Sequence, residues 1–126
     1  IDVAVGGLVA FPDAPLPPNV TVHRNGDVPA LMARATLYVG SLGVTFVEAL
    51  AAGLPVVAAM VADNQRLALV AAREMGIIAF ERPDAQAIAD AALQALYAAP
   101  SAMLEQPDGL GAGRVARALL HRIANP

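Results

Sequence analysis

Two short polar stretches stand out because each follows directly on an apolar run. The first reads GSLGVTFVE and holds the small residues Gly40, Ser41 and Gly43, followed by Thr45 and Glu48. Small residues let a ligand come close to the backbone, and the exposed start of a helix attracts an anion. A carboxylate near that start can accept hydrogen bonds from both hydroxyls of a vicinal diol. The stretch therefore predicts a nucleotide diphosphate site, with phosphate at the amide groups and ribose on Glu48.

A second interpretation of the same residues stays open. The helix is expected to begin near Val44, and Thr45 followed three residues later by Glu48 also matches a capping box. In that arrangement Thr45 would be the N-cap and Glu48 would bond back to its amide. Spacing alone does not separate this structural role from ligand binding.

The second polar stretch, VADNQRL, follows the apolar run Val56–Ala59. Asp63 or Asn64 is a suitable N-cap for the next helix. A cap accounts for one of these residues and leaves Gln65 unexplained. Side-chain amides both donate and accept hydrogen bonds, which suits sugar hydroxyls. We therefore add Asn64 and Gln65 to the candidate binding residues.

The elements that must position these residues alternate along the chain. Short runs that are apolar on both faces predict buried parallel strands, and helical spacing follows most of them. Alternation of this kind predicts an α/β fold, an open parallel Rossmann-like sheet with helices on both faces. The expected strands are 1–5, 20–23, 37–39, 56–59 and 77–80, and the expected helices are 28–35, 45–52, 65–75, 84–98 and 113–123.

The beginning of this pattern is unusual. Such sheets normally open with a strand, a glycine-rich turn and a helix, yet the proline-rich segment 11–19 cannot form that helix. The chain is therefore expected to be a single domain, residues 1–126, that lacks its first βα unit and is a fragment of a two-domain protein. Gly53 and Gly76 are expected to end the helices before them.

The span from Tyr38 to Phe80 resembles the C-terminal domain of GT-B-type sugar-nucleotide enzymes. The similarity is to the UDP-sugar hydrolase of pseudaminic acid biosynthesis and to spore-coat polysaccharide proteins. Its motifs here are a glycine/serine turn, a Thr and a Glu three residues on, Gly-x-Pro, and Asn-Gln. A DGLGAGR ending is also shared. In this sequence the ordered set comprises Gly43, Thr45, Glu48, Gly53-Leu54-Pro55 and Asn64-Gln65.

This resemblance implies a UDP-sugar site of the following kind. Diphosphate would lie at 43–45, ribose on Glu48, and sugar or phosphate near Asn64 and Gln65. The implied chemistry is metal-independent hydrolysis, or transfer to an acceptor in a related GlcNAc transferase. The turn departs from the family pattern at Leu42 and Val44, which reduces the number of polar donors. The catalytic histidine of the hydrolases lies in an N-terminal domain, so this chain is expected to contain no catalytic residue and to have no turnover alone.

Composition limits the alternatives. The net charge of −3 disfavours nucleic-acid binding. The sequence has no lysine and no cysteine, which excludes lysine and thiol chemistry and fits a cytoplasmic protein. No cofactor, metal cluster or membrane span is expected. Because 57% of residues are apolar and 15% charged, a missing N-terminal domain or a dimer partner is expected to cover apolar surface.

The remaining hypotheses concern one turn, two alternative functions and the last helix. The segment HRNGD, which begins at His23, is expected to form a turn, with a backbone contact to uracil as the alternative. A signalling receiver needs an acidic pair and a lysine that this chain lacks. A noncatalytic assembly module of the same fold remains the alternative function. The apolar residues of the last helix (Val115, Leu119, Leu120 and Ile123) are expected to pack into a core.

Overall fold

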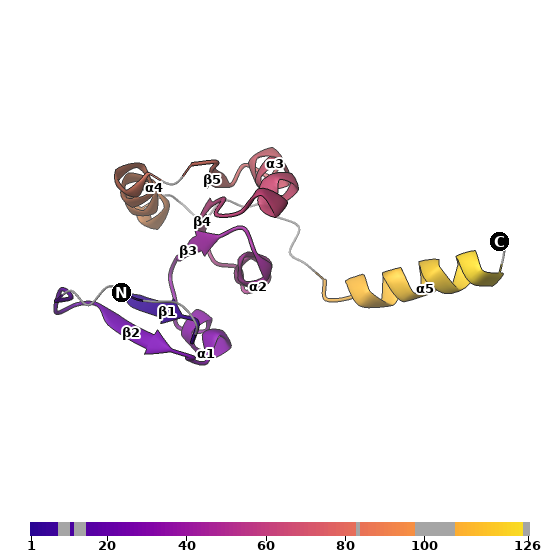
Figure 1. Ribbon diagram of the computed structural model, residues 1–126, viewed down its shortest axis with the longest axis horizontal. Helices are drawn as coiled ribbons and strands as arrows, with labels where there is room; N and C mark the ends of the chain where they lie inside the picture. Colours follow the sequence, from indigo (N-terminus) through magenta and orange to yellow (C-terminus); the bar gives the residue numbers. More distant parts are fainter. Residues whose placement is uncertain (8–10, 12–14, 83, 98–107, 125–126) are drawn as a thin grey trace. The chain divides into compact units, whose positions relative to one another are not determined.

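The computed structural model describes residues 1–7, 11, 15–82, 84–97 and 108–124. It divides into two compact units, residues 1–35 and residues 36–126 (Figure 1). Residues 12–14 of the predicted proline-rich segment, and residues 98–107 before the last helix, lie outside the described residues.

The first unit is built on a pair of parallel strands. Strand β1 (Asp2–Val5) pairs with β2 (Thr21–Arg24) from Asp2 opposite Thr21 onward. Helix α1 (Val28–Met32) follows, and the Asp27 side chain caps it by accepting from the Ala30 amide at 3.0 Å. The helix is shorter than the predicted 28–35. The amide groups of Arg34 and Ala35 bond three residues back rather than four, so the α-helix gives way to a tighter turn.

The second unit contains a three-stranded parallel sheet of order β3-β4-β5. Its strands are β3 (Tyr38–Ser41), β4 (Val56–Ala59) and β5 (Ile78–Phe80). Ser41 lies opposite Ala59, and Ala59 lies opposite Phe80. The carboxyl ends of the three strands therefore meet at one edge of this sheet, where both polar stretches of the sequence begin.

Helices cover both faces of the second unit's sheet. Right-handed crossovers through α2 (Val44–Ala51) and α3 (Arg66–Glu74) place these two helices on one face. A 3₁₀ turn, η1 (Asp63–Gln65), leads into α3. Helix α4 (Ala85–Tyr97) packs on β4 from the other side (Figure 1).

The core of this unit lies around β4. All four residues of β4 are buried, and Val57 is completely inaccessible. Helix α2 presents Phe46, Ala49 and Leu50 to the sheet, a spacing that places the three side chains on one face. This buried face holds the start of α2 at the sheet edge.

The predicted fold class is confirmed, and the predicted glycine stops are too. Gly53 and Gly76 follow α2 and α3 with φ values of 73° and 77°, the left-handed conformation that ends helices. The parallel strands form two ladders, β1-β2 and β3-β4-β5, rather than the expected single sheet. No helix in the described parts of the chain is long and apolar enough to cross a membrane.

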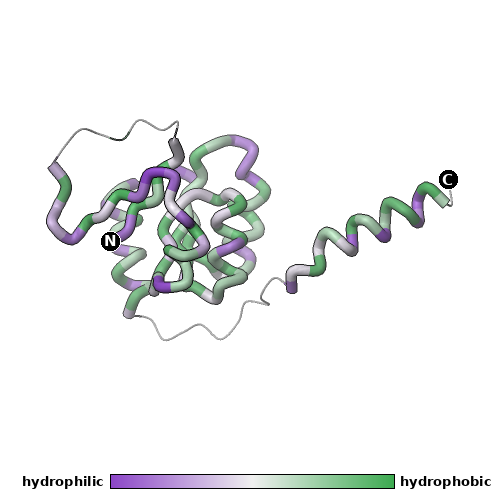
Figure 2. The backbone as a smooth tube through the Cα atoms, turned by 90° about the horizontal axis from the view of Figure 1, so that it is seen from below, coloured by the Kyte–Doolittle hydropathy of each residue, from purple (hydrophilic) through white to green (hydrophobic). Residues whose placement is uncertain are grey.

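The prediction for the last helix is wrong. Helix α5 (Gly111–Ala124) has no buried residue, and its apolar positions are exposed. Figure 2 shows apolar and polar residues alternating along α5, the pattern of an amphipathic helix. The exposed apolar residues of α5 are Val115, Leu119, Leu120 and Ile123.

Candidate functional site

The β3–α2 turn is the centre of the predicted site. Helix α2 begins at Val44 after the N-cap Gly43, which makes no side-chain capping hydrogen bond. Thr45 is already the second helical residue, so the alternative in which Thr45 is the N-cap of a capping box is wrong. The first helical amide groups, at Val44, Thr45 and Phe46, have no carbonyl partner within the helix. The first turn also carries no acidic residue, so the positive end of the helix dipole is available to an anion.

Gly43 has no structural requirement for being glycine. Its φ of −103° is accessible to any residue. A Cβ atom added there would meet only the Ser41 Oγ, at an ordinary contact distance of 3.7 Å. Backbone strain and packing therefore do not demand glycine. The preference for glycine at an N-cap is one reason for it, and close approach of a ligand to the turn would be another.

The surroundings of Gly40 differ from those of Gly43, and the prediction for Gly40 is wrong. We expected Gly40 to leave space for a ligand, but the side chain of Tyr38 fills that space. A Cβ atom on Gly40 would lie 2.6 Å from the Tyr38 Cζ and would also collide with its hydroxyl. The hydroxyl instead donates to the carbonyl oxygen of Ser41 at 3.1 Å. Gly40 therefore serves the packing of Tyr38.

Glu48 lies on the solvent side of α2 near this turn. It is exposed and stands four residues after Val44, so both residues lie on the same stripe of the helix. Its charge reaches Tyr38: burial raises the pKa of the tyrosine hydroxyl, and the Glu48 carboxylate raises it further. Glu48 is thus close to the side chain that holds the turn.

Leu42 and Val44, the two residues that depart from the family pattern, differ in burial. Leu42 is buried, with 4% of its surface exposed, so its side chain belongs to the core. Val44 is 77% exposed at the first position of α2. Neither side chain supplies a polar donor, so the predicted site relies on backbone N–H groups at the start of α2.

The second polar stretch forms a 3₁₀ turn. Ala62 is its N-cap and makes no side-chain bond, so the prediction that Asp63 or Asn64 caps a helix is wrong. The Gln65 Oε1 accepts from the Val61 amide at 2.9 Å and closes the loop. Asn64 is exposed. Since Ser41 lies opposite Ala59, both turns open at the same sheet edge.

Arg66 is a charged residue at this edge that the sequence did not single out. Its guanidinium lies 3.0 Å from Glu81, which follows β5, and 3.7 Å from Asp63. The Glu81 partner is 15 residues away in the chain, so no local motif could reveal the pair. The two carboxylates offset the charge of Arg66 and tie the β4 and β5 ends together.

A cavity of about 250 Å³ lies against β3, β4 and α4. Its wall is formed by Val39, Val57, Val61 and Ile88, together with small residues of the two strands. Of the predicted binding residues only Ser41 lines it. An apolar wall does not suit a diphosphate, and residues 43–45 do not line the cavity, so it is not the predicted diphosphate site.

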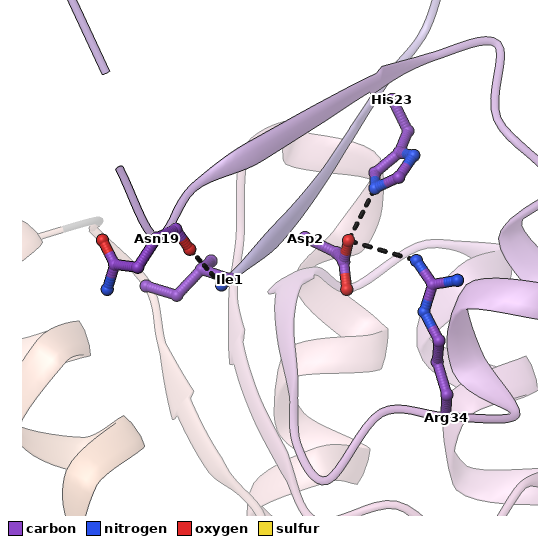
Figure 3. Close-up of polar contacts among 5 residues, drawn as sticks. All are labelled: Ile1, Asp2, Asn19, His23 and Arg34. Carbon is purple, nitrogen blue, oxygen red and sulfur yellow. Dashed lines mark hydrogen bonds and ion pairs between the residues drawn. The ribbon is translucent and has the colours of Figure 1, made fainter. Parts of the chain in front are cut away.

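In the first unit, His23 forms a side-chain cluster with Asp2 and Arg34 (Figure 3). The His23 Nε2 lies 2.6 Å from the Asp2 Oδ1, and the Arg34 Nη2 lies 3.2 Å from the same oxygen. The hydrogen bond from His23, followed by Arg34, holds the pKa of Asp2 below its usual value. The cluster ties β1, β2 and the end of α1 together. Asn25 lies in the predicted turn with φ 51°.

No group of three or more metal-ligating side chains is found among the described residues. A sequence model of the family described as "Glycosyl transferases group 1" matches residues 7–97 of the chain, well over half of it. No match was found among curated proteins or solved structures.

Proposed function

The chain belongs to the glycosyl transferases group 1 family, and from that premise we propose that residues 36–97 bind the nucleotide diphosphate of a sugar donor at the β3–α2 turn. The observation that carries this proposal is the start of α2. Its amide groups are uncapped by any side chain, no carboxylate opposes an anion there, and Gly43 leaves the approach clear.

Glu48 is proposed to hold the ribose. An exposed carboxylate on the same stripe of α2 as Val44 lies within reach of the sugar next to a diphosphate on the first turn. Asn64 and Gln65 are proposed to contact the transferred sugar or a phosphate. The Gln65 oxygen is engaged by the Val61 amide, so its NH₂ group is the part that donates to the ligand.

The finer assignment follows the resemblance. We propose UDP as the nucleotide, with water or an acceptor hydroxyl as the attacking group and cell-surface polysaccharide synthesis as the context. Residues 1–126 are proposed to act as a single nucleotide-sugar-binding domain. The catalytic group is proposed to come from another domain, so this chain binds the donor without turning it over.

Calorimetric titration of UDP into the chain tests the proposal. Glu48→Ala should weaken binding by about 1 to 3 kcal/mol because the ribose hydroxyls lose their acceptor. Gly43→Ala should weaken UDP binding. The fold has room for the methyl group, so the stability cost should be that of a less favourable N-cap, less than about 1 kcal/mol, and binding is measured well below the melting temperature. Glu74→Ala, which removes an exposed carboxylate at the end of α3, is the matched control.

A folded parent chain that gives no heat with UDP would overturn the proposal. Binding that survives Glu48→Ala and Gly43→Ala at full strength would place the nucleotide elsewhere on the protein. Equal losses in the Glu74→Ala control would show that only the net charge of the chain matters.

A second candidate function is assembly without catalysis. The exposed apolar face of α5, including Leu119 and Ile123, favours it. Sedimentation analysis distinguishes the two: an assembly module should self-associate, should be made monomeric by Leu119→Glu, and should not bind UDP.

A further inference from the structure

The last peptide group of β3 is held from both sides. The Leu42 amide donates to the Ala59 carbonyl of β4 at 3.3 Å, a long hydrogen bond. The Ser41 carbonyl of the same peptide accepts from the Tyr38 hydroxyl at 3.1 Å. Two residues later the chain enters α2. The orientation of this one peptide therefore decides how the strand leads into the helix.

The Tyr38 side chain can reach Ser41 only because residue 40 is glycine. Alternation along a strand places Tyr38 and Gly40 on the same face of the sheet. The aromatic ring lies over Gly40, with its Cε1 and Cζ 3.1 and 2.6 Å from the position of a Cβ atom. Tyr38, Gly40 and Ser41 therefore form one unit, in which the hydroxyl bond depends on the missing side chain.

We propose that Tyr38 is a positioning residue for the nucleotide site: its hydroxyl holds the Ser41 carbonyl so that the amide groups at the start of α2 stay aligned for a diphosphate. This inference rests on the proposed function. Tyr38 acts through the turn and does not touch the ligand. A ribose held on Glu48 does not use the amide groups that Tyr38 aligns, so its binding should not depend on the hydroxyl bond to Ser41.

The test compares Tyr38→Phe with the parent chain, using UDP and uridine as probes. The variant keeps the ring over Gly40 and removes only the hydroxyl. UDP should bind roughly three- to tenfold more weakly, the effect of losing one neutral hydrogen bond. Uridine, which has no phosphate, should bind both proteins equally. Tyr97→Phe is the control, because Tyr97 is 87% exposed on α4.

A second variant measures coupling. Gly40→Ala displaces the tyrosine ring, so it should weaken UDP binding in the parent but add little in the Tyr38→Phe background. Additive losses would overturn the proposal, as would equal weakening of UDP and uridine or UDP binding unchanged in Tyr38→Phe. No UDP binding by the parent would overturn the proposed function and this inference together, whereas loss of the Tyr38 effect alone would leave the function standing.

Discussion

The pKa of the Tyr38 hydroxyl, beside the β3–α2 turn, can be measured and depends on the residues around it. Burial, and then the charge of Glu48, raise the pKa of the Tyr38 hydroxyl above the ordinary value of a tyrosine. We expect Glu48→Gln to lower that pKa and to leave part of the shift, which comes from burial. Ultraviolet titration of tyrosinate in a Tyr97→Phe background measures it. An unchanged pKa in Glu48→Gln would mean that the carboxylate points away from the turn.

The cluster of Asp2, His23 and Arg34 should make the stability of the fold depend on pH. Because the pKa of Asp2 in the folded chain lies below the ordinary 3.8, its contribution to stability is present above that pH. The contribution is lost as pH falls through the lowered pKa. We expect His23→Asn to move the Asp2 pKa back toward 3.8, measured by NMR of the side-chain carboxyl. Arg34→Gln should produce the smaller change, and the reverse order would contradict the geometry.

Short motifs are compatible with more than one chemical role. The spacing of Thr45 and Glu48 fits both a cap and a ligand site, and only the observed N-cap, Gly43, separates them. The bond from Tyr38 to Ser41 was not predictable, because it depends on the path of a ring over a glycine. The Arg66–Glu81 pair depends in the same way on strand register.

Elements were predicted more reliably than contacts. The run Val56–Ala59 was identified with its observed bounds, because Pro55 precedes this short apolar run and polar residues that open a helix follow from Asp63. The expected helix at 65–75 became a 3₁₀ turn followed by α3, since local propensity does not distinguish the first turn of the two helix types.

The glycine that ends α3 should contribute measurably to stability. Gly76 has a φ of 77° and no atom within 4 Å of an added Cβ, so a substitution there meets only backbone strain. We expect Gly76→Ala to lower the free energy of unfolding by about 1 kcal/mol, the cost of a left-handed conformation for alanine. Denaturant unfolding measures it. Gly113→Ala in α5 also meets no neighbouring atom, so it is the control and should cause no loss.

In the whole molecule, the backbone of the two units should differ in how readily it opens to solvent. Strand β4 is buried throughout and is paired on both sides, whereas among the described residues β1 is paired only with β2, and it has exposed residues. We expect the amide groups of Val57 and Ala58 to exchange with solvent far more slowly than those of Val3 and Ala4. Hydrogen exchange followed by mass spectrometry measures this. Equal protection would mean that both units open in one cooperative step.

The position of Tyr38 also makes the candidate site optically accessible. The sequence contains two tyrosines and no tryptophan. With Tyr97 replaced by phenylalanine, all tyrosine emission of the protein would come from a ring lying beside the β3–α2 turn. Donor sugars could then be screened, and their association rates followed by stopped-flow fluorescence, without attaching a dye to the protein.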